Sequence, residues 1–184
     1  MKSEITLNES VKEAIEIALM RLLQKKDINK ITVTELTDLA GVGRSSFYRN
    51  FESVEDVAVG YVNRIYREYF KEKPVNPNSY KKSAFLPFLK ERYVFIEQHK
   101  DVFGVLRKNG ILYSALMKMD SEIKKQFLIA DIDESRYFSA MIMSFSAGVI
   151  DEWVAGGMKE SPEELSEITK RCLMGMFIRL KDTF

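Results

Sequence analysis

The stretch from Ile31 to Val57 constrains the fold of this chain more than any other, because two helix starts and a glycine turn follow one another closely. Thr32 and Glu35 have the T-x-x-E spacing of a capping box, which predicts a helix that begins directly after Thr32. Gly41 follows the apolar positions of that helix, where a left-handed terminating residue is favoured. We therefore predict a short helix, a tight turn and a second short helix.

The second of these helices, RSSFYRNF, has two different faces. Phe47 and Phe51 are four residues apart, so both rings lie on one side. The opposite side has hydrogen-bonding residues and no acid: Arg44, Ser45, Ser46, Tyr48, Arg49 and Asn50. Two helices at a steep angle, the second anchored by buried rings, are typical of a helix-turn-helix that enters the major groove of DNA. We predict that this stretch binds double-stranded DNA.

The segment GVGRSSFYRNFESVEDV resembles the signature of the tetracycline-repressor (TetR) family of transcriptional regulators. The turn glycine, the Phe-Tyr pair, the following Phe and the acidic helix start all fall in register with it. Gly43 stands where the family often has a serine cap. Val54 stands where a lysine usually meets a DNA phosphate, so we expect no such contact here. The resemblance is strong over residues 9–57 and moderate over residues 134–180.

The resemblance implies roles for individual residues at the DNA. It places Arg44, Ser45, Ser46 and Arg49 near base edges, and Thr32, Tyr48 and Asn50 near phosphates. Thr32 is also explained by its capping role alone, and the two arginines could be solvated charges. The family's usual mechanism implies a homodimeric repressor that holds two recognition helices about 34 Å apart on a palindromic operator. A small-molecule effector then releases it from DNA.

Composition indicates a globular chain without a membrane helix. Of its 184 residues, 30% are charged and 46% hydrophobic, and no apolar run approaches the ~20 residues that span a bilayer. The start, MKSEITLNES, does not resemble a secretory signal, so we expect a cytoplasmic protein. The net charge is only +1. Positive charge is local instead, with two arginines and no acid between Gly41 and Phe51.

Helical periodicity along the chain predicts an all-α fold of about nine helices. The first helix is expected from Leu7 to Lys25, and Pro87 should kink a helix within residues 79–98 or make it start late. We predict three parts: a helix-turn-helix domain at 1–52, a connecting helix at 53–73, and a ligand-binding and dimerisation domain at 74–184. Pro74 and Pro77 mark the second boundary.

Aromatic residues and a methionine of the middle section have two explanations. They could line a cavity for a small apolar or aromatic effector, or they could form an ordinary core. The residues are Tyr66, Phe88, Tyr93, Phe103, Tyr113 and Met117.

Two long helices with wide apolar faces are expected at 134–155 and from Pro162 to Lys181, the second after a Ser-Pro-x-Glu start. The resemblance implies that they pair with their copies in a four-helix bundle. The expected dimer interface contains Tyr137, Met141, Phe145, Gly148, Trp153, Ile168, Cys172 and Met176.

Other chemistry has little support. Cys172 and His99 are the only residues of their types, so we expect a buried thiol, a surface histidine, no metal and no cofactor. An enzyme that uses either residue, or a carboxylate pair, is disfavoured because no motif surrounds them. The main alternative is a DNA-binding regulator, even an activator, that a partner protein controls.

Overall fold

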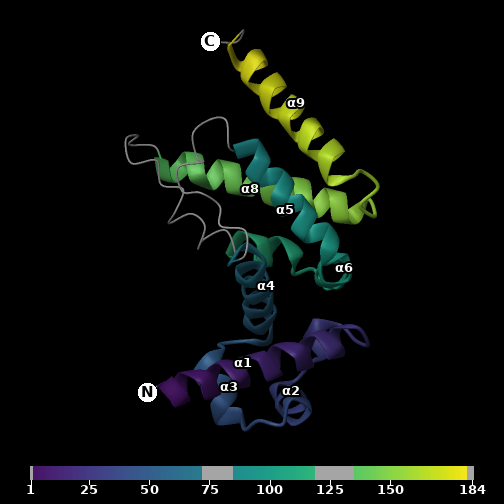
Figure 1. Cartoon of the computed structure of the whole chain (residues 1–184). Coiled ribbons are helices and arrows are strands. Elements are labelled where there is room, and N and C mark those ends of the chain that lie inside the picture. Colours follow the sequence, from purple (N-terminus) through teal and green to yellow (C-terminus); the bar gives the residue numbers. More distant parts are fainter. Residues whose placement is uncertain (1, 72–84, 119–134, 182–184) are drawn as a thin grey trace.

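The computed structural model describes residues 2–71, 85–118 and 135–181. Within these ranges there are nine α-helical segments, a short 3-10 helix and no strand, which confirms the predicted all-α fold. The two termini lie at opposite ends of an elongated molecule (Figure 1). The segments are α1 (Lys2–Leu23), η1 (Ile28–Lys30), α2 (Val33–Ala40), α3 (Arg44–Asn50), α4 (Val54–Lys71), α5 (Phe85–Gln98), α6 (Lys100–Lys108), residues 112–118, α8 (Ser135–Ala155) and α9 (Pro162–Lys181).

The N-terminal head consists of α1 to α3 with the start of α4. Helix α1 packs across α2, α3 and α4, and its Ile15 and Leu19 are fully buried. It begins and ends earlier than the predicted span of Leu7 to Lys25. The carbonyl of Leu22 accepts hydrogen bonds from the amides of both Lys25 and Lys26, which closes the chain into a turn at that point.

Helix α4 approaches the head closely because it has a glycine at the contact. A Cβ atom built on Gly60 would lie 2.9 Å from Cε1 of Phe51 and 3.0 Å from Oε1 of Glu16. The other end of α4 points toward the second half of the molecule (Figure 1). This one helix therefore touches both halves.

An aromatic junction, made of Tyr66, Tyr69, Phe70, Phe95 and Phe103, joins α4 to α5 and α6. The buried ring of Phe95 lies 5.3 Å from Tyr66 and 5.8 Å from Phe103, in edge-to-face contacts. The hydroxyl of Tyr69 also donates a hydrogen bond of 2.7 Å to Glu91 on α5. Edge-to-face pairs of this kind add stability beyond the area they bury.

A second link joins the head to α6 without passing through α4. Asn109 caps the C-terminus of α6, and its Oδ1 accepts a 2.9 Å hydrogen bond from the amide of Ile28 in η1. The Asn109 Nδ2 donates to the carbonyl of Val105, which holds the side chain against its own helix. The head is therefore attached to the rest of the chain at two separate points.

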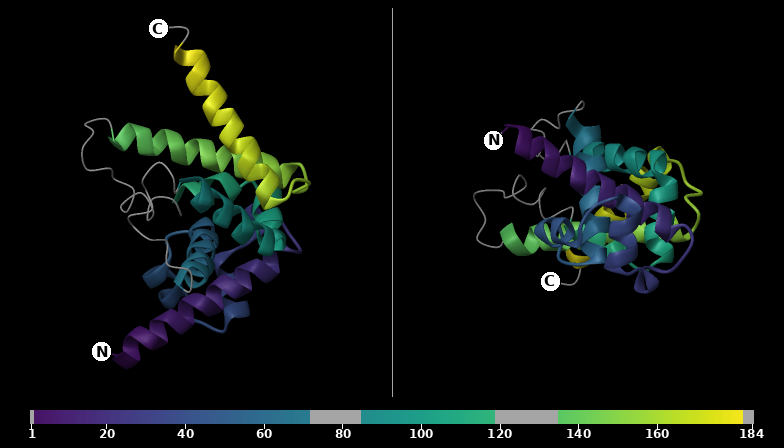
Figure 2. Two further views of the ribbon diagram at one scale, coloured as in Figure 1. Left: turned by 45° about the horizontal axis from the view of Figure 1, so that its top comes forward. Right: turned by 90° about the horizontal axis from the view of Figure 1, so that it is seen from below.

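In the second half of the molecule, α5 packs against α9 and α6 packs against α8. Figure 2 shows α9 crossing over α8 and extending away from the other helices. Pro87 lies in the first turn of α5, where a missing amide hydrogen breaks no helical bond. Residues 79–84 of the predicted span lie outside the described residues, so the choice between a late start and a kink stays a prediction.

The turn between α8 and α9 contains a left-handed glycine and ends in the capping box that the sequence predicted. Gly157 has φ of +82°, and the amide of Met158 donates a 2.9 Å hydrogen bond to the carbonyl of Trp153. At the start of α9, the amide of Ser161 donates to Glu164, and the amide of Glu164 donates to the Ser161 hydroxyl. This reciprocal capping box fixes the start of α9 at Pro162. Among the described helices, none has the length and apolar character needed to cross a membrane.

Candidate nucleic-acid interface

The turn between α2 and α3 is built by local hydrogen bonds. The Thr32 hydroxyl accepts a 3.2 Å bond from the amide of Glu35, as the capping box predicts. The Glu35 carboxylate instead pairs with Lys26, so only half of the reciprocal box forms. Gly41 has φ of +68°, which ends α2 where the sequence predicted.

Two buried rings hold α3 in place. Phe47 is fully buried and Phe51 is nearly so, with their ring centroids 6.0 Å apart. Tyr48 packs edge-on against Phe47 but leaves 64% of its surface exposed. The helix is therefore anchored on one side and open on the other.

The open side carries the residues that the sequence singled out. Arg44, Ser45, Tyr48 and Arg49 are exposed. Ser46 and Asn50 are half-buried, and the Asn50 amide donates a 2.8 Å hydrogen bond to the carbonyl of Ser46 in the same helix. Thr32 is exposed at the start of α2. Binding of DNA by any of these residues stays a prediction.

The first arginine of α3 has a partner that the sequence did not reveal. Nη2 of Arg44 donates a 2.5 Å hydrogen bond to the hydroxyl of Thr34, an exposed residue of α2. The two residues are ten positions apart on different helices, so no local motif signals the contact.

A buried ion pair supports the back of the head. Nε of Arg64 on α4 donates a 2.6 Å hydrogen bond to Glu16 on α1, whose side chain is 4% exposed. Arg64 also contacts the more exposed Glu13 and Glu68 and the ring of Tyr61. Burial raises the pKa of the Glu16 carboxyl, and the Arg64 guanidinium opposes that rise. The position of Glu16 three residues before Leu19 was an available signal, because it places an acid on the apolar face of α1.

The residues expected to line an effector cavity have different environments. Tyr66 and Phe103 belong to the aromatic junction, while Tyr93 is fully buried, with its hydroxyl 3.0 Å from that of Thr169. Met117 is half-buried and Tyr113 is 45% exposed. The side chain of Phe88 lies outside the described residues. A cavity among these residues stays a prediction.

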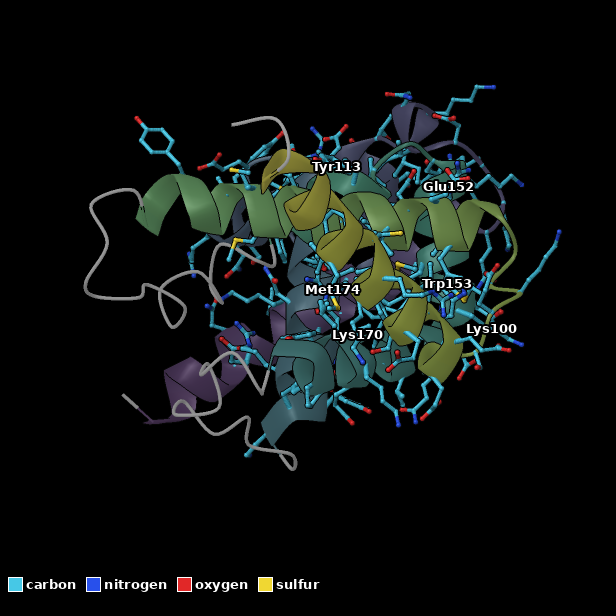
Figure 3. The ribbon with its side chains drawn as sticks, turned by 90° about the horizontal axis from the view of Figure 1, so that it is seen from above. Lys100, Tyr113, Glu152, Trp153, Lys170 and Met174 are labelled. Atoms are coloured by element: carbon cyan, nitrogen blue, oxygen red, sulfur yellow. The ribbon has the colours of Figure 1, made fainter. Side chains whose placement is uncertain are left out.

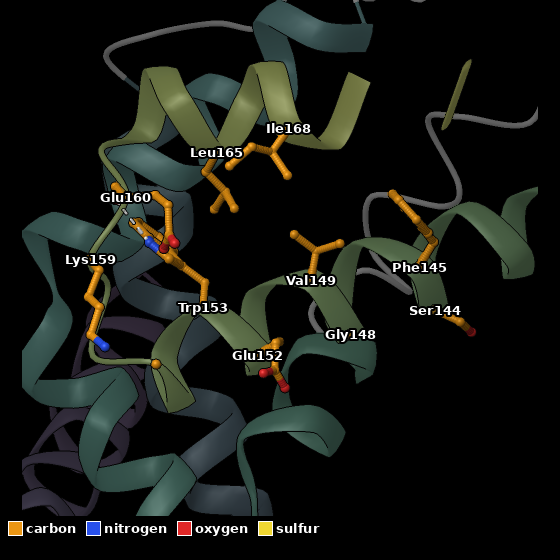
Figure 4. Close-up of a pocket in the computed structure, with 11 residues that line it drawn as sticks. Ser144, Phe145, Gly148, Val149, Glu152, Trp153, Lys159, Glu160, Leu165 and Ile168 are labelled. Carbon is orange, nitrogen blue, oxygen red and sulfur yellow. Dashed lines mark hydrogen bonds between the residues drawn. The ribbon is translucent and has the colours of Figure 1, made fainter. Parts of the chain in front are cut away.

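An open groove of about 640 Å³ lies between α8 and α9. Phe145, Gly148, Trp153 and Ile168 of the expected dimer interface line it, together with Val149 and Leu165 (Figure 4). Four polar or charged residues also line it, namely Ser144, Glu152, Lys159 and Glu160. The Trp153 indole donates a 3.0 Å hydrogen bond to the carbonyl of Glu160, which joins α8 to the turn before α9.

Other members of the expected interface lie on exposed surface. Tyr137 and Met141 on α8 are 58% and 66% exposed. Met174 of α9, which the sequence did not place in the interface, is 56% exposed on the helix that crosses over α8 (Figure 3). Cys172 is exposed, so the prediction of a buried thiol is wrong for the single chain. It lies in the second half of α9, the helix that extends away from the other helices (Figure 2). The side chain of Met176 lies outside the described residues.

His99 lies at the junction of α5 and α6. It is half-buried rather than on the open surface, and its Nδ1 is 2.8 Å from the carbonyl of Phe95. Within the described ranges, no three His, Cys, Asp or Glu side chains converge as metal ligands.

Known proteins resemble this chain in the sequence of its second half and in fold. Residues 86–175 match the TetR-type family described as "Transcriptional regulator C-terminal region". Native NalD from Pseudomonas aeruginosa, the secondary repressor of the MexAB-OprM multidrug efflux pump, superposes with a TM-score of 0.55 at 15% identity, covering 90% of this chain and 95% of that one. AlkX, a TetR family repressor from Dietzia sp. strain DQ12-45-1b, gives a TM-score of 0.44 at 15% identity, covering 86% and 91%. No curated protein sequence matches the chain.

Proposed function

Because the chain belongs to the TetR family of transcriptional regulators, we propose that it is a homodimeric repressor that binds a palindromic operator through α3. The observation that carries this proposal is the two-sided character of α3. Buried rings at Phe47 and Phe51 fix the helix, and its outer face offers hydrogen-bond donors without any acid. An anchored helix of this kind loses little freedom on entering a major groove.

The proposed contacts divide into two groups. Arg44, Ser45, Ser46 and Arg49 read base edges, since an arginine can bind the guanine edge through two hydrogen bonds. Thr32, Tyr48 and Asn50 contact phosphates and set the position of the helix on the duplex. The small local excess of positive charge means that affinity depends strongly on having two copies.

The proposed dimer forms through α8 and α9. Helix α8 carries exposed apolar residues in its first half, Tyr137 and Met141, and the groove around Gly148 and Trp153 in its second half. A two-fold interface uses the same surface on both copies. If the two α8 helices run antiparallel, the protruding residues of each copy meet the groove of the other. This self-complementarity supports a second copy of the chain as the occupant.

The proposed signal is a small apolar or aromatic effector that binds in the middle helices. Support comes from the aromatic junction, because it includes Tyr66 and Phe103 and also joins α4 to α5 and α6. An effector that favours a wider spacing of the two heads lowers DNA affinity. A metabolite set tested by thermal melting should contain a compound that raises the melting temperature. A result with no stabilising compound favours control by a partner protein.

The proposal is tested by selecting bound sequences from a random duplex DNA library. We expect a palindrome whose half-sites are centred about one helical turn apart. Recovery of no duplex, or of sites without two-fold symmetry, would contradict the proposed function.

Substitutions on α3 test the division of contacts. Tyr48→Ala should weaken binding to operator and random duplexes alike, because a phosphate contact carries no sequence information. Arg44→Ala should reduce the difference in binding affinity between operator and random DNA, because Arg44 reads a base edge. Titrations of both variants on both duplexes measure these effects. Equal losses on both duplexes for both variants would contradict the assignment.

A further inference from the structure

The hydrogen bond between Arg44 and Thr34 joins α3 to α2 on the exposed side of the head. Both side chains are exposed, and Nη2 of the guanidinium lies 2.5 Å from the threonine Oγ1. Thr34 is not part of the cap of α2, because Thr32 has that role. Its hydroxyl is therefore not required to start the helix, and its contact with Arg44 needs another explanation.

The contact leaves the arginine able to read a base. A guanidinium has five N–H donors, and two-point recognition of a guanine edge uses two of them. The Thr34 hydroxyl takes one donor, so enough remain for the base. An exposed arginine otherwise samples many rotamers, and fixing one of them on binding lowers affinity.

We propose that Thr34 is a positioning residue that determines specificity, holding the Arg44 guanidinium in one orientation before DNA binds. This inference rests on the proposed function, since it concerns how α3 reads a base. Thr34 acts through Arg44 and itself contacts no base. Its effect therefore appears in discrimination between DNA sequences rather than in general affinity for DNA.

Two substitutions separate the hydroxyl from the shape of the side chain. Thr34→Val removes the hydroxyl with little change in volume or in helix propensity. Thr34→Ser keeps the hydroxyl and is the matched control. Both are combined with Arg44→Ala, so that a double-mutant cycle measures the coupling between the two residues. Each variant is titrated with the selected operator and with a random duplex at several salt concentrations, and its melting temperature is recorded.

We expect Thr34→Val to bind the operator about two- to tenfold more weakly, the range that follows from freeing one long side chain. Its affinity for random DNA, its salt dependence and its melting temperature should match those of the unmodified protein. Thr34→Ser should behave like the unmodified protein. In the Arg44→Ala background, Thr34→Val should cause no further loss.

Several results would overturn the inference. An equal loss on operator and random DNA would mean that Thr34 contacts a phosphate itself or stabilises the head. A loss that persists in the Arg44→Ala background would exclude action through Arg44, and an unchanged operator affinity would show that the hydrogen bond has no role. If the unmodified protein binds no duplex, the proposed function fails, and this inference fails with it. If the unmodified protein binds an operator and Thr34→Val binds it equally well, only this inference fails.

Discussion

Glu16 shows how one side chain can limit the stability of the head. It is 3% exposed, and its carboxylate is held by Arg64 from a different helix. Removing a carboxylate from water costs free energy. The attraction within the ion pair offsets this desolvation cost only when the two charged groups are close together. Burial therefore raises the pKa of Glu16 above its ordinary value of 4.5, although Arg64 lowers it in part.

The raised pKa of Glu16 gives a prediction about stability and pH. The Glu16 carboxyl binds its proton more tightly in the folded chain than in the unfolded chain. The stability that this proton contributes is therefore complete below pH 4.5 and is lost as the pH rises through the folded-state pKa. In Glu16→Gln the side chain cannot ionise. The free energy of unfolding of this variant should therefore fall less than that of the unmodified protein as the pH rises from 4.5 through the folded-state pKa of Glu16. Denaturant unfolding at a series of pH values measures the difference.

Glu13→Gln provides the matched control for that measurement. Glu13 contacts the same Arg64 guanidinium, but its side chain is 52% exposed. If the free energy of unfolding changes with pH in the same way in Glu16→Gln and in the unmodified protein, burial of the Glu16 carboxylate has no influence on stability.

Among the elements, η1 and α6 form the second attachment of the head. The Ile28 amide and the Asn109 side chain join residues that are 81 positions apart, and the contact is partly buried. This bond limits how η1 can move relative to α6. The helix-turn-helix follows η1 directly, so its orientation depends on α6 as well as on α4.

Asn109→Ala should release this attachment. It leaves the Ile28 amide without its acceptor, which costs about 1–3 kcal/mol for a buried donor. Hydrogen–deuterium exchange at the segment that contains Ile28 should become faster. Asn109→Asp keeps an oxygen at the same position and should keep the protection. Unchanged exchange in Asn109→Ala would show that another group fixes η1.

At the scale of the whole molecule, the groove between α8 and α9 provides a test of the dimer. A Cβ atom on Gly148 would meet no atom within 4 Å, so one copy of the chain can accommodate a long side chain at this position. We expect Gly148→Arg to fold with unchanged helical content and to be a monomer in sedimentation experiments. Operator affinity should fall by about 10²-fold or more, because the two heads no longer bind together.

Gly104→Arg is the control for that experiment. Gly104 is also exposed with open space around it, but it lies on α6, outside the expected interface. This variant should remain a dimer. A dimeric Gly148→Arg would place the interface between copies elsewhere on the molecule.

The sequence predicted those features that depend on neighbouring residues. The cap at Thr32, the left-handed Gly41 and the capping box of Ser161 and Glu164 all formed at the expected positions. The burial of Phe47 and Phe51 was predicted for the same reason, because their spacing of four residues places both on one helical face. Helix type and helix ends were therefore readable from local patterns.

The tertiary structure alone decided which helices meet and what their contacts leave exposed. The bonds from Arg44 to Thr34, Arg64 to Glu16 and Ile28 to Asn109 each join different helical elements. Cys172 was misplaced because a helix with apolar residues on more than one face does not indicate which face its neighbours will cover. Hydrogen bonds within one turn of helix are fixed by the order of residues along the chain. Contacts between helices depend on crossing angles and distances, which arise only when the whole chain packs together.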